Sequence, residues 1–236
     1  MKRIALVTGA NKGIGFAIAQ QLAEAGLEVI LGARDESAGR AAAARIPGAR
    51  HLQLDVTADD SVRAAARALD ALDVLVNNAG IGDPDDGSAA TATLSALHRT
   101  FDVNFFGAVA ITQTLLPLLR RSSAGRIVNV SSSLGRPEMQ TPLHSLAYRA
   151  SKAALNMFTV TLAQALADTS IKVNAAEPGY TLTDLNRHLA AAQPGWTPPP
   201  HVQTVDDAAR TPVRLALLAD DGPTGGLFDK TGRVPW

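Results

Sequence analysis

Residues 3–15 read RIALVTGANKGIG, and this stretch decides the fold. Its apolar segment IALV indicates a short buried strand, and a stretch with helical periodicity follows the last glycine. Between them lie Gly9, Gly13 and Gly15 in the spacing G-x3-G-x-G. Glycines at such a turn let the backbone approach a pyrophosphate, and the start of the helix offers free N–H donors and a positive dipole end. The stretch therefore predicts a dinucleotide-binding turn.

The rest of the chain alternates short apolar runs with longer Ala-rich stretches of helical periodicity. Strands are predicted at 3–7, 28–32, 50–54, 73–76, 126–130 and 171–175, with a weak one at 225–229. Helices are predicted at about 14–25, 36–45, 59–70, 94–120, 146–168 and 205–219. Strands that are apolar throughout suit a parallel sheet covered on both faces. The order predicts an α/β protein with a doubly wound parallel sheet in three α/β/α layers, a Rossmann fold, formed as a single domain by residues 1–236.

Composition excludes several classes of protein. The 22 Lys and Arg residues balance 22 Asp and Glu residues, so there is no basic excess for nucleic acid or an anionic membrane. No cysteine is present, which excludes disulfides and thiolate nucleophiles, and the five histidines show no metal-ligand spacing. The N-terminal apolar run is too short for a signal peptide, and no stretch suggests a membrane span. We expect a cytoplasmic protein with no metal, no nucleic-acid partner and no membrane.

The end of the second predicted strand indicates which dinucleotide binds. A ribose 2′-hydroxyl is usually bound by an acidic residue at this point, whereas a 2′-phosphate favours arginine. Ala33 stands where the acid is expected, Arg34 follows it, and Lys12 adds a second positive charge in the glycine turn. These residues favour NADP(H). Asp35 is the alternative ribose ligand, and it would favour NAD if the strand ended one residue later than 28–32.

A tyrosine and a lysine four residues apart, Tyr148 and Lys152, lie at the start of a predicted helix and share one face. A nearby cation favours the phenolate and lowers the pKa of a tyrosine, so the pair is a candidate general acid/base for interconverting a hydroxyl and a carbonyl. Polar groups also follow other strands, as Asn77-Asn78-Ala79-Gly80, Ser131-Ser132-Ser133 and Glu177-Pro178-Gly179-Tyr180-Thr181-Leu182-Thr183. Asn104 lies within an apolar helix, where an amide needs a partner.

These motifs, TGxxxGxG, NNAG, a helix Asn, Ser, YxxxK and PGxxxT, resemble in order and separation those of the short-chain dehydrogenase/reductase family. The resemblance covers nearly the whole chain, and the C-terminal half is similar to the carbonyl-reductase-like branch. It implies an NADPH-dependent enzyme that reduces an aldehyde or ketone. Two alternatives stay open: an NADP-dependent secondary-alcohol dehydrogenase, and a non-catalytic NADP-binding sensor.

The resemblance also implies roles for individual residues. Tyr148 would be the general acid, Lys152 would hold the nicotinamide ribose and lower the tyrosine pKa, Ser132 would bind the carbonyl oxygen, and Asn104 would hold a relay water. Ser132 is chosen over its neighbours because the family pattern S-x-x-G ends at Gly135. The cofactor would be bound by Gly9, Asn11, Lys12, Gly13, Ile14, Gly15, Arg34, Asp55, Val56, Asn78, Ala79, Gly80, Tyr148, Lys152, Pro178, Gly179, Tyr180 and Thr183.

The substrate is expected under a loop at about 180–204, which is rich in proline. Its pocket would be lined by Leu134, Met139, His144, Tyr180 and Trp196. Ser132 and Tyr148 are slightly further apart than is usual in the family, so 136–147 carries a small insertion, much shorter than in monomeric carbonyl reductases. The predicted helices 94–120 and 146–168 are where family members dimerise, so a homodimer or homotetramer is expected.

Overall fold

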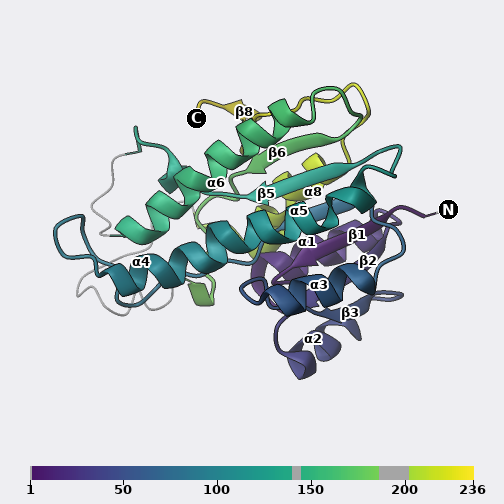
Figure 1. Ribbon diagram of the computed structural model, residues 1–236, viewed down its shortest axis with the longest axis horizontal. Helices are drawn as coiled ribbons and strands as arrows, with labels where there is room; N and C mark the ends of the chain where they lie inside the picture. Colours follow the sequence, from purple (N-terminus) through teal and green to yellow (C-terminus); the bar gives the residue numbers. More distant parts are fainter. Residues whose placement is uncertain (1, 140–144, 186–201) are drawn as a thin grey trace.

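The computed structural model describes residues 2–139, 145–185 and 202–236. Eight strands form one sheet in the order β3-β2-β1-β4-β5-β6-β7-β8 (Figure 1). Their bounds are β1 Ile4–Thr8, β2 Glu28–Ala33, β3 Arg50–Gln53, β4 Val74–Asn77, β5 Arg126–Val130, β6 Lys172–Ala176, β7 Leu227–Phe228 and β8 Arg233–Val234. Neighbouring strands are parallel from β3 to β7, and β8 is antiparallel to β7. The predicted doubly wound sheet is confirmed.

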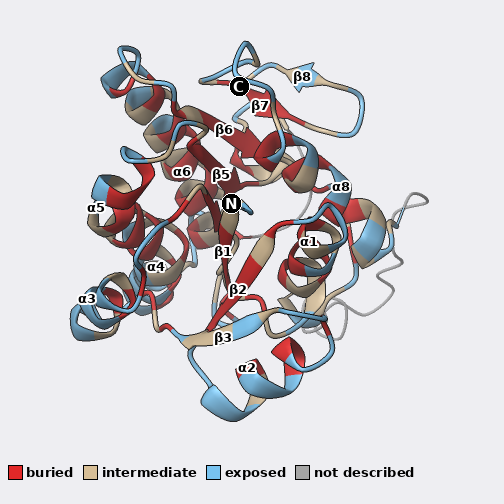
Figure 2. Cartoon of the chain, turned by 90° about the vertical axis from the view of Figure 1, so that its right-hand side faces the viewer, coloured by how far each residue is buried: buried red, intermediate tan, exposed pale blue. Residues whose placement is uncertain are grey.

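Helices cover both faces of the sheet, as Figure 2 shows. One face carries α1 (Gly13–Glu24), α2 (Glu36–Ala43) and α8 (Val205–Ala216), whose apolar residues form one core cluster with β1, β2 and β4. The other carries α3 (Asp59–Arg67), α4 (Leu94–Phe101), η1 (Asp102–Phe106), α5 (Gly107–Leu119) and α6 (Leu146–Ala165). A second cluster fills this layer. Because both faces are covered, every residue of β4 and β5 is buried, as is every residue of β1 after Ile4 (Figure 2).

Several predicted boundaries were wrong. The second strand ends at Ala33, one residue later than 28–32, and α2, α3, α6 and α8 end two to three residues earlier than predicted. The weak strand at 225–229 is only the two residues of β7, and the sequence did not indicate β8. Strands this short depend on pairing with a neighbour rather than on their own residue pattern.

The helical run from Leu94 to Leu119 is not one regular α-helix. A π-helical turn, η1, interrupts it between α4 and α5. By length and composition alone the run could span a membrane, contrary to the sequence prediction, but core helices share these properties. Here α5 packs its apolar side against the sheet through Ile111, Leu115 and Leu119, all fully buried. A π-turn of this kind is frequent at functional sites, and this one contains Asn104.

Candidate functional site

The site lies at the carboxyl edge of the sheet, where the strand order reverses. β1 has β2 on one side and β4 on the other, so the chain crosses to opposite faces at this point. In open α/β sheets ligands bind outside the carboxyl ends of the strands at such a switch point. The glycine turn follows β1, and Asn78-Ala79-Gly80 follows β4.

The glycine turn is packed tightly onto the segment after β4. Gly9 has φ +64°, and a methyl group there would lie 2.9 Å from Ala79 Cα. A methyl group at Gly15 would lie 2.5 Å from Gly9 O and would overlap Asn78 Nδ2. The side chain of Asn78 donates to Thr8 O (3.0 Å) and Gly9 O (3.2 Å). Asn78, predicted as a cofactor ligand, therefore organises the turn, and glycine is needed at both positions.

Thr8 was missed by sequence reasoning although it stands directly before the first glycine. Its Oγ1 accepts hydrogen bonds from the N–H groups of Asn78 and Ala79, both at 3.0 Å, and donates to Val76 O at 3.4 Å. Thr8 thus fastens the end of β1 to the end of β4. The signal was a buried hydroxyl at a strand end, where it must find partners.

The start of α1 fits a dinucleotide phosphate group. Gly13, Ile14 and Gly15 form its first turn, whose N–H groups have no acceptor within the helix. Lys12 precedes the helix without capping it through its side chain, and the first turn contains no acidic residue. Gly13 has φ +58°, and a methyl group there would lie 3.8 Å from its nearest neighbour, Thr183 Cγ2, so the space beside the turn is open. Free N–H donors with a positive helix end suit a pyrophosphate.

The adenosine end of the predicted site contains Arg34 and Asp35. The strand does end one residue later than predicted, which reopens the case for Asp35 as a ribose ligand. However, Asp35 is the N-cap of α2, and its Oδ1 accepts the N–H of Ala38 at 2.8 Å. Arg34 is exposed. The carboxylate is therefore already engaged, whereas the guanidinium is accessible to a ligand.

Asp55 and Val56, predicted beside the adenine, follow β3. Asp55 Oδ1 accepts from the N–H and the hydroxyl of Thr57, and these hydrogen bonds hold the pKa of the carboxyl below its usual range. Val56 is buried, and a methyl group at Gly107 would lie 2.7 Å from its Cγ2. Its side chain is therefore a packing contact with α5, so any contact with the cofactor must come from its backbone.

Tyr148, Ser132 and Lys152 come together at the ends of β5 and α6. The Ser132 side chain lies close enough to the Tyr148 hydroxyl to lower its pKa. Lys152 Nζ lies 5.6 Å from the centroid of the Tyr148 ring and donates to Val130 O at 2.8 Å. Lys152 is 4% exposed, so its ammonium is held inside the protein. The structure thus assembles three of the four predicted catalytic side chains in one cluster.

Burial sets the electrostatics of this cluster. It raises the pKa of Tyr148, and the hydrogen bond from Ser132 opposes the shift. The expected lowering by Lys152 is not found. Burial also lowers the pKa of Lys152 to about 8, and its ammonium points at a backbone carbonyl. At neutral pH Tyr148 is therefore protonated and can donate.

Asn104, the fourth predicted residue, lies beside the cluster. A methyl group at Gly80 would lie 3.4 Å from Asn104 Oδ1 and 3.7 Å from Lys152 Nζ. The Asn104 side chain is already bound: Oδ1 accepts from Ile81 N at 2.8 Å, and Nδ2 donates to Ile81 O at 3.0 Å and to Ser151 Oγ at 3.1 Å. Both N–H groups of the amide are therefore used, so a relay water held by this residue would have to bind the second lone pair of Oδ1 or the backbone.

The segment after β6 closes the site on the far side. Pro178 is buried, Gly179 has φ +83°, and burial raises the pKa of Tyr180. Thr181 is bridged to Gln203, whose N–H donates to Tyr180 O at 2.8 Å. These contacts bring the start of the predicted substrate loop next to its end.

The ammonium group of Lys12 is paired within the protein rather than directed at the adenosine end of the predicted cofactor site. It forms an ion pair with Asp184 at 2.8 Å, and both side chains are more than half exposed. Asp184 directly follows Thr183, which lies beside the glycine turn. The pair therefore joins the glycine turn to the segment after β6, a contact that the sequence did not indicate.

The predicted substrate residues are only partly within the described residues. Leu134 and Met139 are half-buried in the segment after Ser132, and Arg149 Nη2 donates to Met139 O at 2.7 Å. His144 and Trp196 lie outside the described residues, as does most of the predicted loop.

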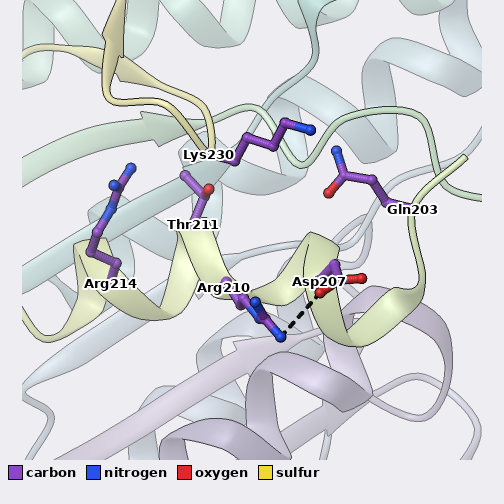
Figure 3. A pocket seen from close by; sticks show the side chains of 6 residues that line it. All are labelled: Gln203, Asp207, Arg210, Thr211, Arg214 and Lys230. Atoms are coloured by element: carbon purple, nitrogen blue, oxygen red, sulfur yellow. Dashed lines mark ion pairs between the residues drawn. The ribbon is translucent and has the colours of Figure 1, made fainter. Parts of the chain in front are cut away.

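A separate pocket of about 340 Å³ lies between α8 and the segment that follows β7. In Figure 3 the side chains of Lys230 and Gln203 converge on it from above α8. Its other lining residues are Asp207, Arg210, Thr211 and Arg214, and Arg210 is paired with Asp207 at 3.1 Å. None of the predicted catalytic residues lines this polar pocket.

Known proteins resemble this chain over nearly its full length. The short chain dehydrogenase profile matches residues 3–194. A (-)-isopiperitenone reductase of Mentha piperita is 32% identical over 98% of this chain and 97% of its own. Among solved structures, an NADPH-bound carbonyl reductase from chicken fatty liver has a TM-score of 0.85 at 27% identity and covers 99% of this chain, 98% of its own. A gluconate 5-dehydrogenase of Burkholderia cenocepacia, in complex with NADP and tartrate, has a TM-score of 0.86 at 31% identity, covering 97% and 94%. On this evidence the chain belongs to the short-chain dehydrogenase/reductase family of oxidoreductases that use a nicotinamide cofactor.

Proposed function

We propose that this protein is an NADPH-dependent reductase that converts the carbonyl of an aldehyde or ketone into an alcohol. Bound NADPH supplies a hydride to the carbonyl carbon. Tyr148 donates its phenolic proton to the carbonyl oxygen, so that carbon and oxygen together gain one hydride and one proton. Ser132 donates a hydrogen bond to the same oxygen and stabilises the charge that develops there. Lys152 holds the nicotinamide ribose and keeps a positive charge near the phenol.

The observation that carries this proposal is the cluster of Tyr148, Ser132, whose side chain acts on the Tyr148 hydroxyl, and buried Lys152. Each of these two hydroxyls has one hydrogen to donate, so a carbonyl oxygen placed between them would accept from both. The raised pKa of Tyr148 keeps its proton available at neutral pH. A protonated phenol is the state that reduction needs, and the same group would act as the base in the NADP-dependent oxidation of a secondary alcohol.

The preference for NADPH is supported by Arg34. Its guanidinium is exposed at the end of β2, whereas the competing carboxylate of Asp35 caps α2. NADP is also present in the two neighbouring solved structures described above. Lys12 would add a second contact on leaving Asp184, and since both side chains are exposed this exchange costs little.

Three variants test the reaction. Tyr148→Phe should retain NADPH affinity in a calorimetric titration and lose turnover with a panel of aldehydes and ketones. Ser132→Ala should lower kcat by about 10²- to 10³-fold, whereas Ser133→Ala, which removes a hydroxyl that acts on the pKa of Glu177 rather than of Tyr148, should leave it nearly unchanged. Unchanged turnover in Tyr148→Phe would contradict the mechanism, and the absence of turnover in the wild-type protein would favour the non-catalytic sensor.

The coenzyme preference has its own test. Arg34→Ala should weaken NADPH binding by about 10- to 100-fold through loss of a charge-assisted hydrogen bond, and should leave NADH binding unchanged. Equal losses for both coenzymes would mean that Arg34 does not bind the 2′-phosphate. An NADH preference in the wild-type protein would return Asp35 to the ribose.

We also propose that the protein is a homodimer or homotetramer in the cytoplasm. Phe106 and Met157 are 55% and 62% exposed on η1 and α6. The ring of Phe105 packs against that of Phe106 at 5.2 Å and edge to face against that of Phe158 at 6.5 Å. Large apolar side chains exposed over an aromatic cluster suit burial by a second copy. Sedimentation equilibrium of Phe106→Glu should show a shift toward monomer relative to the wild-type protein.

A further inference from the structure

The first turn of α6, which carries Tyr148, is capped by a different part of the chain. Its preceding residue, Ser145, makes no side-chain cap, and the buried Ser145 hydroxyl has no hydrogen-bond partner in the described part of the chain. Instead Leu146 N donates to Gly87 O at 2.9 Å. Ala147 N and Tyr148 N donate to the two carboxylate oxygens of Asp86 at 2.9 and 3.0 Å.

Residues 86 and 87 thus provide the acceptors that this first turn needs. A helix leaves its first N–H groups without intrahelical acceptors, and burying them unpaired is costly. The next amide, that of Arg149, already donates within the helix start, to Ser145 O at 3.0 Å. One of the amides held by Asp86 belongs to Tyr148 itself. The carboxylate therefore fixes the backbone of the residue that carries the phenol.

The segment that bears Asp86 is itself anchored. Asp83, 4% exposed, accepts from Arg99 Nε at 2.7 Å and from Arg99 Nη2 at 2.9 Å. Asp86 N donates to Asp83 O at 3.1 Å. At the other end of the segment, Ile81 forms two backbone hydrogen bonds with the side chain of Asn104. The segment is therefore tied to α4 and to η1 before it reaches α6.

We propose that Asp86 is a positioning residue for catalysis: its carboxylate locks the first turn of α6, so that Tyr148 meets Ser132 and the substrate oxygen in a fixed geometry. Charge supports this role as well as geometry, because a carboxylate at a helix N-terminus interacts favourably with the helix dipole. The inference rests on the proposed role of Tyr148 as the acid.

The test compares Asp86→Ala and Asp86→Asn with Thr93→Ala. The Thr93 hydroxyl caps α4 by accepting from Ala96 N at 3.2 Å and otherwise pairs with the Ser95 hydroxyl, so its loss removes a comparable cap on another helix. A catalytic group misplaced by about 1 Å costs about 10²-fold in rate. Asp86→Ala should therefore lower kcat by about that factor, with KM and NADPH affinity within about twofold of the wild-type values. Asp86→Asn keeps one acceptor oxygen and should recover most of kcat. Thr93→Ala should keep wild-type kcat.

Hydrogen exchange gives a readout that does not depend on activity. The amides of Ala147 and Tyr148 should lose protection in Asp86→Ala, retain part of it in Asp86→Asn, and keep it in Thr93→Ala. Equal kcat and equal protection in Asp86→Ala and Thr93→Ala would overturn the proposal. If Asp86→Ala does not fold, a wild-type kcat in Asp86→Asn despite lost protection of the Ala147 and Tyr148 amides would overturn it instead, because the turn would then be released at no cost to the rate. If the wild-type protein reduces no carbonyl, the proposed function fails, and exchange alone still decides whether Asp86 holds this turn.

Discussion

Replacing Gly135 with alanine should move Ser132 away from α6, the helix that carries Tyr148 and Lys152. Gly135 ends a short 3-10 helix, η2 (Ser133–Gly135), directly after Ser132, and it is buried against α6. A methyl group there would lie 2.8 Å from the carbonyl carbon of Lys152, 2.9 Å from its Cβ and 3.0 Å from Ala153 N. The backbone itself accepts alanine, because Gly135 has no positive φ.

The size of the displacement follows from these contacts. Carbon atoms in contact normally lie about 3.5–4.0 Å apart, so η2 and α6 must separate by roughly 0.5–1 Å. None of the three contacted atoms is at the flexible end of a side chain, so the strain falls on the backbones of η2 and α6. Overpacking of this kind costs about 1–3 kcal/mol, which lowers Tm by about 2–4 °C for each kcal/mol in a chain of this size. A separation of this size should also lower kcat by about 10²-fold.

Gly48→Ala is the matched control for this prediction. Gly48 has φ +76° and no atom within 4 Å of the added methyl group, so alanine there is strained but displaces nothing. A left-handed alanine costs about 1–2 kcal/mol. Both variants should therefore lose similar stability in thermal unfolding, but only Gly135→Ala should lose kcat with the best carbonyl substrate. Equal kcat in the two variants would refute the claim that η2 sets the distance between Ser132 and α6.

Three further predictions concern titration and stability. The chain has only two tyrosines, so ultraviolet titration of Tyr180→Phe reports Tyr148 alone. The midpoint of this titration should lie above 10, because burial raises the pKa of Tyr148. Adding Ser132→Ala should raise the midpoint further, because the Ser132 side chain lowers this pKa. Lys152 has a pKa of about 8 when folded against 10.5 in a free side chain, so the unfolded chain binds the extra proton between these values. The free energy of unfolding measured in urea should therefore rise by about 3 kcal/mol across this range relative to Lys152→Met; a flat difference would contradict a depressed lysine pKa. Arg126→Ala should lower the free energy of unfolding by about 3–5 kcal/mol in the same assay. The Arg126 side chain is 1% exposed and donates to Leu218 O, just after α8, at 2.9 and 3.0 Å. A loss below 1 kcal/mol would mean that water replaces the guanidinium.

The parts of the site that follow strand ends could be predicted from sequence. A parallel sheet brings the ends of β1, β4, β5 and β6 to one edge, so residues there lie near one another whatever the loops do. Tyr148 and Lys152 share a helix face through local geometry alone. These features depend on periodicity and chain order, which a single sequence contains.

Electrostatics could not be predicted in the same way. From spacing alone, Lys152 should lower the pKa of Tyr148, yet burial raises it. The sign depends on how much water each group loses and on where the ammonium points, here at Val130 O. Likewise, the exposed pair of Lys12 and Asp184 depends on a loop conformation that no pattern specifies. Desolvation belongs to the packed structure rather than to a motif.

Asp86 lies between these two cases. In the sequence it stands in an acidic, turn-rich stretch, 81–92, that is typical of a surface loop and has no motif. Its partner amides are about sixty residues away, so no local rule connects them. The sequence does indicate the donor side of this interaction, because a predicted helix start has N–H groups that need acceptors. Because nearly all buried backbone donors are satisfied, the useful question about a helix that carries a catalytic residue is which residue accepts from its first turn. In this protein that residue is Asp86, whose carboxylate connects Tyr148, the proposed acid, to the loop that follows β4 at the cofactor edge of the sheet.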